Sequence, residues 1–459
     1  MYSGYDSDLG PPIERAFPSA DTPSQNAMRM ASWSMVLDFD DVMLGGHTGH
    51  SSVLVPLAMA NGHSGSELLL AQIVANEIAA RINMVCALGS TRGQMATHLH
   101  LIAAAAARAK LLRLDAEEFA AALAFALSYP AQTSYSAFLG SDAKAMCAGW
   151  PVRAGMESVD AVHAGLRANH DVLEDFFQTR TRVPVREFLD GLGERWHTAT
   201  NSYKIYPACG YLCSAIDATL DLVRDHDVHS SEVESVEVSS SIFAIGMDAH
   251  SLPYLDGPRS RISTLTFSTP FVIASTILAH DFTPDELKRT WINDARVWEL
   301  ASRVRTRHDV ALTLDALTAD IPIGAALRHA TRVQAAAFGS VAAKTAALPP
   351  LQTARLIAGL ASSAGDRRPL DFSRSTKPLG ARVSIRLTGG RTLRRRRSIP
   401  RGFAGCKDDV RELMRTKFVN AAIRVIGYER AAQSVTMIES IERLPPSSIS
   451  RLTSALLFA

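Results

Sequence analysis

The first two hundred residues repeat their apolar positions with the period of an α-helix. The helical pattern runs from Gln25 to about Leu222. Ser64 and Glu67 form a capping box directly before the apolar run LLLAQIVANEIAARI, and a capping box is a sequence signature of a helix N-terminus. The segment therefore predicts a set of packed helices.

Two further helices of this region are rich in alanine. The run HLHLIAAAAARAKLLRL spans His98 to Leu114, and Asp115 and Glu118 form a second capping-box start before EEFAAALAFAL. Small side chains allow helix backbones to approach closely, which is typical of a helix packed on several sides. We expect a compact all-α bundle here.

The pattern changes after Asp227. Glu232–Ile245 (EVESVEVSSSIFAI) begins with apolar and polar residues in alternation, which indicates a strand with one wet face. The sequence ARVSIRL, followed by Gly389-Gly390 and RTLRRRRSI, predicts a β-hairpin with a tight turn. Residues 341–377 contain several prolines and glycines and are predicted to be a loop-rich connection.

These elements predict a mainly α protein with an inserted α+β domain. Both chain ends contribute to the all-helical domain, over residues 25–203 and 405–459, and residues 204–404 form a smaller α+β lid. Residues 1–24, with four prolines and many small polar residues, are expected to be an extended lead-in.

Composition excludes several classes of protein. The 459 residues are 47% hydrophobic and 20% charged with a net charge of +2, which excludes broad disorder and a dedicated nucleic-acid binder. The five cysteines are scattered, no signal-peptide pattern is visible, and no apolar run reaches the roughly 18 residues of a membrane helix. We expect a cytoplasmic protein with no membrane or nucleic-acid partner.

The segment LDFDDVMLGGHTGHSSVLVP holds the densest group of titratable residues. Its members are Asp38, Asp40, Asp41, His47 and His50. Such a cluster can supply a general acid or base near neutral pH, although capping carboxylates beside surface histidines would give the same pattern. Asp and His also bind metals, but no standard metal-ligand spacing is present, so we expect no metal.

Two other segments carry candidate groups. Lys144, among small residues in GSDAKAMCAG, is either a solvated loop lysine or a partner for a substrate carboxylate. Cys209 and Cys213 have a spacing of four and could share a helical face. An iron–sulfur cluster with Cys147 would lack a fourth ligand, so buried structural thiols are the simpler interpretation.

Two basic patterns have ordinary structural explanations. Arg394 to Arg397 lie on a predicted strand, where alternate side chains face opposite sides, so a charged hairpin edge is favoured over a phosphate site. His98 and His100, two positions apart on a helix, do not face the same way and are interpreted as packing or surface residues.

Several of these segments together resemble the MmgE/PrpD family, which includes 2-methylcitrate dehydratase, cis-aconitate decarboxylase and iminodisuccinate epimerase. The segments that resemble it, in order along residues 25–440, are LDFDD with its Gly/His loop, SGSELLLAQIVANEIAARI, AAAAARAKLLRLDAEEFAAALAFALS, GSDAKAMCAGWPVRAG, KIYPACGYLCSAIDATLDL, FSTPFVIASTILAHDFTPDEL and IPRGFAG. The resemblance implies cofactor-free homodimers that act on small polycarboxylates at a site between a helical domain and a lid.

The resemblance also implies roles for individual residues. Asp38 falls on the active-site aspartate and Lys144 on the lysine, while the histidine of the family falls near Gly49, so that His47 or His50 must supply it. This chain departs from the family at four positions. Val42 stands where a threonine is common, Gln94 and Cys213 stand at histidine positions, and Phe271 stands where a tyrosine is frequent.

The leading hypothesis is a cofactor-independent lyase or isomerase that transfers a proton next to a carboxylate or carbonyl of a small acid. His47 or His50 would be the base or acid, Asp38 or Asp41 would orient it, and Lys144 would bind the carboxylate. Gln94, Cys209, Cys213 and Phe271 are the candidate substrate-binding residues. The alternative is a catalytically altered member that acts as a ligand-binding or scaffold protein.

Overall fold

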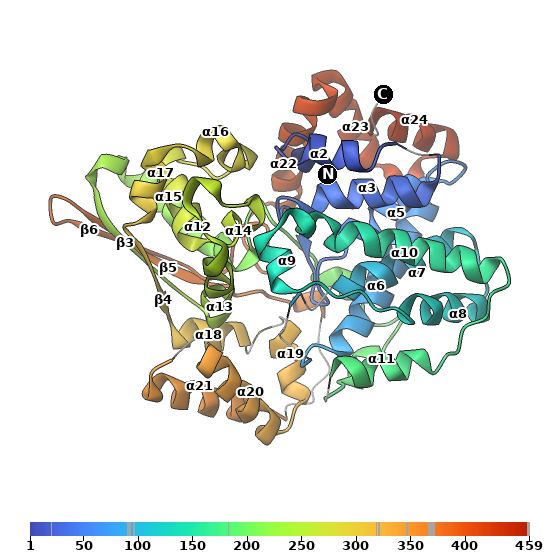
Figure 1. The fold of residues 1–459 in the computed structure, drawn as a ribbon, viewed down its shortest axis with the longest axis horizontal. Coiled ribbons are helices and arrows are strands. Elements are labelled where there is room, and N and C mark those ends of the chain that lie inside the picture. Colours follow the sequence, from blue (N-terminus) through green and yellow to red (C-terminus); the bar gives the residue numbers. More distant parts are fainter. Residues whose placement is uncertain are drawn as a thin grey trace.

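A computed structural model describes residues 1–19, 21–89, 93–94, 97–181, 183–317, 319, 322–345, 348–365 and 372–456. Most of these residues are helical, and one four-stranded mixed sheet lies at the end of the molecule away from both termini (Figure 1). The fold is therefore mainly α with a small β component, as the sequence predicts.

The first helical part is built around the alanine-rich helix α7. Its helices are α3 (Pro23–Met35), α4 (Gly49–Ser52), α5 (Leu54–Ala58), α6 (Gly65–Val85), α7 (Thr97–Leu111), α8 (Ala116–Leu127), α9 (Tyr135–Gly140), α10 (Met146–His163) and α11 (Val172–Arg180). Both α6 and α10 pack on α7, whose residues Ala103–Ala107 are fully buried. At Gly155 of α10 a Cβ atom would lie 2.3 Å from the carbonyl oxygen of Leu101, so the close approach depends on a missing side chain.

Both predicted capping boxes are confirmed. The Ser64 hydroxyl accepts from the backbone N–H of Glu67, and the Glu67 carboxylate accepts from the N–H of Ser64. Asp115 and Glu118 make the same reciprocal pair at the start of α8. Each box satisfies two N–H groups that the helix itself leaves without partners.

The two ends of the chain pack together in this helical part (Figure 1). The last helices are α22 (Val410–Ile426), α23 (Tyr428–Ile438) and α24 (Pro446–Leu456). Tyr2 is buried among Ala422, Ile426 and Leu452, and its hydroxyl donates to the carbonyl oxygen of Leu456 over 2.8 Å.

The prediction that residues 1–24 are extended is wrong over part of that range. Short helices α1 (Tyr2–Tyr5) and α2 (Gly10–Ala16) form there, and α3 begins at Pro23. Pro11 and Pro12 are the second and third residues of α2, and Pro23 is the first residue of α3, so all three lie in a first turn, where a proline loses no helical hydrogen bond.

The second part of the chain places helices on a sheet of order β4-β3-β5-β6. The strands are β3 (Val233–Ser240), β4 (Val304–His308), β5 (Ala381–Leu387) and β6 (Thr392–Arg397), and β3 is parallel to β4 and antiparallel to β5. The predicted hairpin is confirmed, since β5 pairs with β6 in antiparallel register across a turn that contains Gly389 and Gly390.

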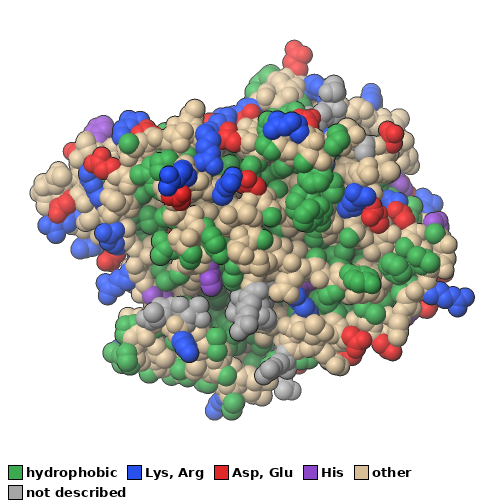
Figure 2. Space-filling view, viewed as in Figure 1, with side chains coloured by type: hydrophobic (Ala, Val, Ile, Leu, Met, Phe, Trp, Pro, Cys, Tyr) green, Lys and Arg blue, Asp and Glu red, His purple; other side chains and the backbone are tan. Residues whose placement is uncertain are grey.

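One face of this sheet is apolar and the other is charged. Val236, Val238, Val383 and Ile385 are buried where α12 (Cys213–His226) and α15 (Thr269–Ala279) cover the sheet. Arginine and lysine side chains gather at this end of the molecule (Figure 2). The alternation of polar and apolar residues along each strand produces this difference.

The arginine run follows the same alternation, as the sequence predicts. Arg395 pairs with Asp225 on α12, and Arg396 pairs with Asp315 on α18 at 3.2 Å. Neighbouring arginines therefore point to opposite faces of the sheet. The two ion pairs are part of the ordinary structure of this domain.

The prediction of a loop-rich connection over residues 341–377 is wrong for much of that segment. The remaining helices of this part are α13 (Ile242–Ser251), α14 (Ile262–Leu265), α16 (Arg289–Ile292), α17 (Ala295–Ala301), α18 (Val310–Leu317), α19 (Pro322–His329), α20 (Arg332–Thr345) and α21 (Pro350–Ser363). Pro350 occupies the first turn of α21, so the Pro-Pro pair begins a helix instead of a loop. Residues 346–347 and 366–371 of the segment lie outside the described residues.

Candidate active site

Two short strands bring distant segments together beside the core of the helical part. β1 (Asp41–Val42) pairs antiparallel with β2 (Ser202–Tyr203). The pairing continues by one residue, because the backbone N–H of Lys204 donates to the carbonyl oxygen of Asp40 over 3.0 Å. Lys204 therefore lies directly opposite Asp40, although the two are far apart in the sequence.

The Lys204 ammonium is fully buried and holds two carboxylates. Its Nζ donates to Asp38 Oδ2 at 2.5 Å, to the carbonyl oxygen of Asp38 at 3.0 Å and to Asp40 Oδ1 at 2.7 Å. Burial opposes the charge on this amine, but the two carboxylates outweigh burial and raise the pKa of Lys204 above its ordinary value. Lys204 is thus a permanent cation whose three hydrogens are all bonded.

Asp38 has an unusual backbone and a second cationic partner. Its φ of 54° lies in the left-handed region, which a residue other than glycine rarely adopts. Its Oδ1 accepts from Lys144 Nζ at 3.0 Å. Burial alone would raise the pKa of Asp38, but Lys144 and Lys204 outweigh it and lower the pKa to about 2. The strained turn after α3 is therefore held by two buried ammonium groups.

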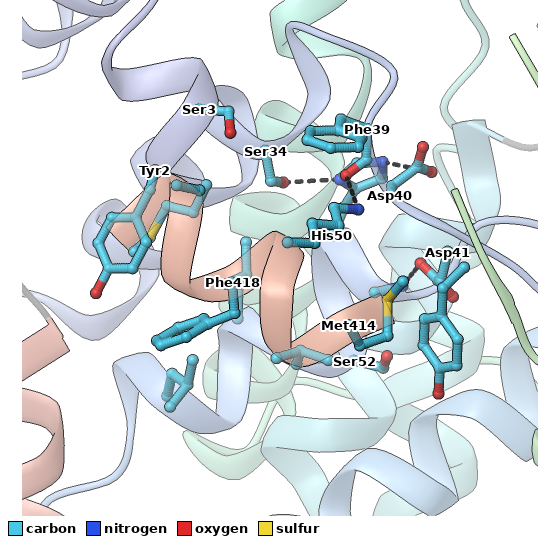
Figure 3. Close-up of a pocket in the computed structure, with 18 of the residues that line it drawn as sticks. Tyr2, Ser3, Ser34, Phe39, Asp40, Asp41, His50, Ser52, Met414 and Phe418 are labelled. Atoms are coloured by element: carbon cyan, nitrogen blue, oxygen red, sulfur yellow. Dashed lines mark hydrogen bonds and ion pairs between the residues drawn. The ribbon is translucent and has the colours of Figure 1, made fainter. Parts of the chain in front are cut away.

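Asp40 joins both loop histidines. Its Oδ2 accepts from His47 Nδ1 at 2.7 Å. The same oxygen accepts from His50 Nε2 at 3.1 Å, and Ser34 Oγ lies 2.7 Å from His50 Nδ1 (Figure 3). Burial disfavours a charged imidazole, but Asp40 outweighs it and raises the pKa of His47 above its ordinary value. Burial likewise opposes the charge on Asp40, yet Lys204 and the histidines keep the pKa of Asp40 well below its usual range.

The Asp41 side chain bonds to the backbone of the loop, unlike the side chains of Asp38 and Asp40. Its Oδ1 accepts from the backbone N–H of Gly49 at 2.9 Å and thereby holds the start of α4. A Cβ atom at Gly49 would lie 2.5 Å from the same oxygen. Because the family resemblance places a histidine near Gly49, this loop cannot accept that side chain without moving Asp41. In the structure the side chain of Asp40, and not that of Asp38 or Asp41, contacts the histidines, and Asp41 meets His47 only through its backbone carbonyl oxygen.

A cavity of about 340 Å³ lies between the helical part and the sheet domain. Four of the predicted site residues line it, namely Asp38, His47, Gln94 and Cys209, together with Asp40, His100, Lys204 and Lys377. The other predicted residues, Asp41, His50, Lys144, Cys213 and Phe271, do not line it. The cleft thus brings one of the two histidines and two of the three loop carboxylates to a common surface.

Lys144 lies behind this surface. It is 1% exposed, and its Nζ lies 5.3 Å from the ring centre of Phe138 and 4.8 Å from that of Phe267. Both rings line the cavity. The interpretation of Lys144 as a solvated loop lysine is therefore wrong, and its ammonium acts on the cavity through Asp38.

The predicted cysteine and phenylalanine positions are apolar packing sites. Burial raises the pKa of Cys209 to about 12 and that of Cys213 well above its ordinary value, so both remain neutral thiols. Phe271 is fully buried in α15, where its ring packs 5.6 Å from that of Trp298. The structure does not bring Phe271 or Cys213 to the cleft.

The sequence interpretation of His98 and His100 as packing or surface residues needs one addition. Both are buried, and burial lowers the pKa of His98 to about 3. Burial also holds the pKa of His100 well below its ordinary value, and its ring centre lies 5.4 Å from that of His50. A neutral imidazole of His100 therefore faces the cavity beside the loop histidines.

Lys417 of α22 supports the cluster from the C-terminal end of the chain. Its Nζ donates to the carbonyl oxygens of Phe39 at 3.0 Å and Lys204 at 2.7 Å, and it lies 3.7 Å from the centre of the Phe39 ring. Burial is the main reason that the pKa of Lys417 falls to about 7, and the Lys204 charge adds to it. This amine titrates near neutral pH.

Three lysines of the site are absent from the sequence prediction: Lys204, Lys377 and Lys417. Lys377 Nζ donates to the carbonyl oxygen of Thr200 at 2.7 Å, to Ser202 Oγ at 3.0 Å and to the carbonyl oxygen of Val42, so it fastens β1 to β2. Lys204 is the first residue of the segment that contains Cys209 and Cys213. Its place in that segment is the local feature of the sequence that points to it.

Within the described ranges, no group of three or more His, Cys, Asp or Glu side chains could hold a metal ion. Among the same residues, one helix, α6, is long and apolar enough to cross a membrane, but most of its apolar window is buried in the protein, as in the core helix of a folded domain.

Comparison with known families matches both halves of the chain. The MmgE/PrpD N-terminal domain matches residues 19–178, and the MmgE/PrpD C-terminal domain matches residues 206–334. No curated protein matches the chain. The two domain matches cover most of the chain in the order that the resemblance predicts, and Lys204 lies in the stretch between them. The chain therefore belongs to the MmgE/PrpD family.

Proposed function

We propose that this protein is a lyase or isomerase that transfers a proton at a carbon next to a carboxylate or carbonyl of a small acid. MmgE/PrpD domains suggest a function of the dehydratase or lyase type. The observation that carries the proposal is the contact of 2.7 Å between His47 Nδ1 and Asp40 Oδ2 at the wall of the interdomain cavity. A carboxylate–imidazole pair in a cleft is a common arrangement for general acid–base catalysis.

His47 is the proton-transfer group in this proposal. Both atoms near its Nδ1, Asp40 Oδ2 and the carbonyl oxygen of Asp41, are acceptors, so Nδ1 carries a hydrogen. The neutral ring then has its lone pair on Nε2. With its side chain 34% exposed, His47 is open to the cavity, whereas the side chain of His50 is 2% exposed. We therefore assign the base to His47 and a supporting role to His50.

His47 alone can take up and return the proton of the reaction. The C–H bond breaks, its proton goes to His47 Nε2, and its electron pair moves toward the adjacent carboxylate or carbonyl. The pair then either expels a β-hydroxyl, which leaves as water with the proton that His47 returns, or takes a proton back at the same carbon. Asp40 stabilises the imidazolium in between, and the imidazolium itself offsets the enolate charge, because Lys204 and Lys144 already balance the carboxylates of Asp38 and Asp40.

The cations of the cleft suggest a substrate with few carboxylates. The Lys204 ammonium donates all three hydrogens to oxygens of Asp38 and Asp40, and that of Lys377 makes three contacts with oxygens around β1 and β2. A tricarboxylate would need several cations with donors directed at it. A mono- or dicarboxylic acid is the class that we propose.

Exchange of the carbon-bound proton tests the proposal. Candidate mono- and dicarboxylic acids are incubated in D₂O with the wild type and with His47→Gln, and loss of the α-proton signal is followed by NMR. We expect exchange with the wild type and a rate at least about 100-fold lower with His47→Gln. Equal rates for the two proteins would refute the role of His47.

The alternative, a family member that binds a ligand without turnover, has one supporting observation. Gly49 occupies the position near which the family carries its histidine, and Asp41 fills the space beside it. This alternative predicts no exchange with any acid, together with a rise in melting temperature in the presence of the acid that binds.

The cytoplasmic location, the homodimer and the independence from cofactors stay predictions. Light scattering of the purified chain measures the oligomer. The exchange experiment, run after dialysis against a chelator and without added cofactor, tests the last point.

A further inference from the structure

The interdomain cavity has a charged part and an uncharged part. The charged side chains at its surface belong to Asp38, Asp40, His47, Lys204 and Lys377. Helices α9, α13 and α20 provide another part of the lining, and α9 packs against α13 near the middle of the molecule (Figure 1). Among the described residues, no side chain that these three helices contribute to the cavity is an acid, a lysine or an arginine. The cavity therefore places an apolar surface beside a charged one.

Aromatic rings make up much of the uncharged part. Three pairs of rings line it: Phe138 with Phe267, Tyr211 with Phe243, and Tyr135 with His250. The rings of Tyr211 and Phe243 are nearly parallel, with an angle of 22° between their planes and 5.5 Å between their centres. Both residues are only partly buried, so they keep accessible surface. Flat aromatic faces of this kind gain most from contact with another flat ring.

The rings lie close to the buried charges of the cluster. Lys144 Nζ, which contacts Asp38 Oδ1, lies 5.3 Å from the ring centre of Phe138 and 4.8 Å from that of Phe267. Tyr211 follows Gly210, where a Cβ atom would lie 3.7 Å from Lys204 Cε. The cavity has a volume of about 340 Å³, at the lower end of the roughly 300–1,000 Å³ of small-molecule sites. One small molecule can therefore contact both parts.

The polar groups on these rings are uncharged at neutral pH. Burial lowers the pKa of His250, so its imidazole is mainly neutral at pH 7. Burial also raises the pKa of Tyr135 and of Tyr211, so both phenols keep their protons. A neutral phenol can donate a hydrogen bond to an acid group, and its ring remains an apolar surface. This part of the cavity therefore does not oppose an uncharged ring.

We propose that the acid on which this protein acts carries an aryl group, which binds against Phe243 and the neighbouring rings of the cavity. The inference rests on the proposed function for the acid group and adds the group at the other end of the substrate. An acid of a few carbons without a ring would leave the aromatic surface against water. An aryl group covers that surface, so it supplies binding free energy away from the carbon that loses its proton.

Three unreactive acids test the aryl site without turnover. They are 3-phenylpropanoate, 3-cyclohexylpropanoate and butanoate, which carry a phenyl, cyclohexyl or methyl group on the third carbon of propanoate. None has a β-hydroxyl group to lose. In calorimetric titrations of the wild type, we expect 3-phenylpropanoate to bind at least about tenfold more tightly than butanoate. It should also bind at least about twofold more tightly than 3-cyclohexylpropanoate, whose ring is not flat.

Substitutions at Phe243 locate the binding. In Phe243→Ala we expect the affinity for 3-phenylpropanoate to fall at least about fivefold, and in Phe243→Leu, which keeps an apolar side chain of similar bulk, at least about threefold. Phe119→Ala is the matched control, since Phe119 is also partly buried but does not line this cavity, and its affinity should stay within about twofold of the wild type. Thermal unfolding checks that each variant folds, and Phe243→Leu decides if Phe243→Ala does not.

Three results would overturn the aryl site. They are equal affinities of the wild type for 3-phenylpropanoate and butanoate, an affinity for the cyclohexyl acid that equals or exceeds that for the phenyl acid, and an unchanged affinity in Phe243→Leu. Failure of the proposed function is a separate result. Ring-dependent binding without exchange of any α-proton would refute proton transfer and leave the aryl site, whereas equal exchange efficiency for acids with and without a ring would do the reverse.

Discussion

Asp40 lines both the interdomain cavity and a second cavity of about 450 Å³ among α3, α4, α6 and α22, and the two cavities differ in how their polar groups are compensated. On the interdomain side, the carboxylates of Asp38 and Asp40 contact Lys204, and each has a further cationic or imidazole partner. On the other side, Asn76 and Asn201 keep oxygens without partners among the described residues. Buried charges must be paired to remain charged, whereas a neutral amide oxygen can stay buried without a partner at a smaller cost.

Removing the Lys204 ammonium should change the free energy of unfolding more than any other substitution considered for the two cavities. Lys204→Met leaves the buried carboxylates of Asp38 and Asp40 without their common partner, and breaking such a pair costs about 3–5 kcal/mol of the free energy of unfolding. Urea denaturation at pH 7 measures the loss. Lys110→Met, at an exposed position of α7, is the control and should change stability by less than about 0.5 kcal/mol. Similar stabilities for the two variants would contradict the central role of Lys204.

Replacing each histidine separately sharpens the difference between the two sides. We expect His47→Gln to lower the exchange rate about 100-fold or more, because His47 lines the reaction cavity. His50→Gln should lower it less than about tenfold, since His50 faces the other cavity. His63→Gln, which touches neither cavity, should leave the rate unchanged. A larger loss for His50→Gln than for His47→Gln would reverse our assignment.

The pH dependence of stability separates the two kinds of charge in the cluster. The pKa of Asp38 is about 2 in the fold, below its ordinary value of 3.8, so its contribution is present above pH 4 and is lost as the pH falls toward 2. The pKa of His47 is raised above 6.5, so its contribution is complete below pH 6.5 and is lost as the pH rises through the raised value. Urea titrations of the wild type and His47→Gln measure both. A stability difference between them that grows with pH above 6.5 would contradict the second assignment.

The smallest expected effect concerns the asparagine pair of α6. Asn83→Leu removes the hydrogen bond to Gly45 and should lower the free energy of unfolding by about 1 kcal/mol. Asn76→Leu removes an oxygen without a partner among the described residues, so stability without ligand should stay the same or rise slightly. Thermal and urea unfolding compare the two. An equal loss for both variants would mean that Asn76 is already compensated.

Local signals predicted much of the fold. The capping boxes at Ser64 and Asp115 and the turn at Gly389-Gly390 depend on residues that are neighbours in the sequence, and all three are confirmed. The first residues and the segment around Pro350 were misread because proline in the first turn of a helix resembles proline in a loop. The packing of Tyr2 against the C-terminal helices was not visible at all, since it joins opposite ends of the chain.

The site was less accessible to sequence reasoning than the fold. The composition of the Asp–Gly–His loop and the small residues around Lys144 predict part of the site, and the family resemblance adds roles for both, but the role of Lys204 depends on the β1–β2 pairing, which no local pattern reveals. Phe271 was chosen by position in the family, and the structure places it in the core of the sheet domain. The functions of all these residues stay predictions until exchange is measured.

The contacts of Lys417 have a consequence for how the protein is made. The backbone oxygens that it holds, at Phe39 and Lys204, belong to segments that leave the ribosome long before α22 does. Until residue 417 has been translated, the charged turn around Phe39 lacks the hydrogen bonds that Lys417 donates in the folded protein. Chaperone binding to stalled nascent chains should therefore persist until α22 has emerged and then decline.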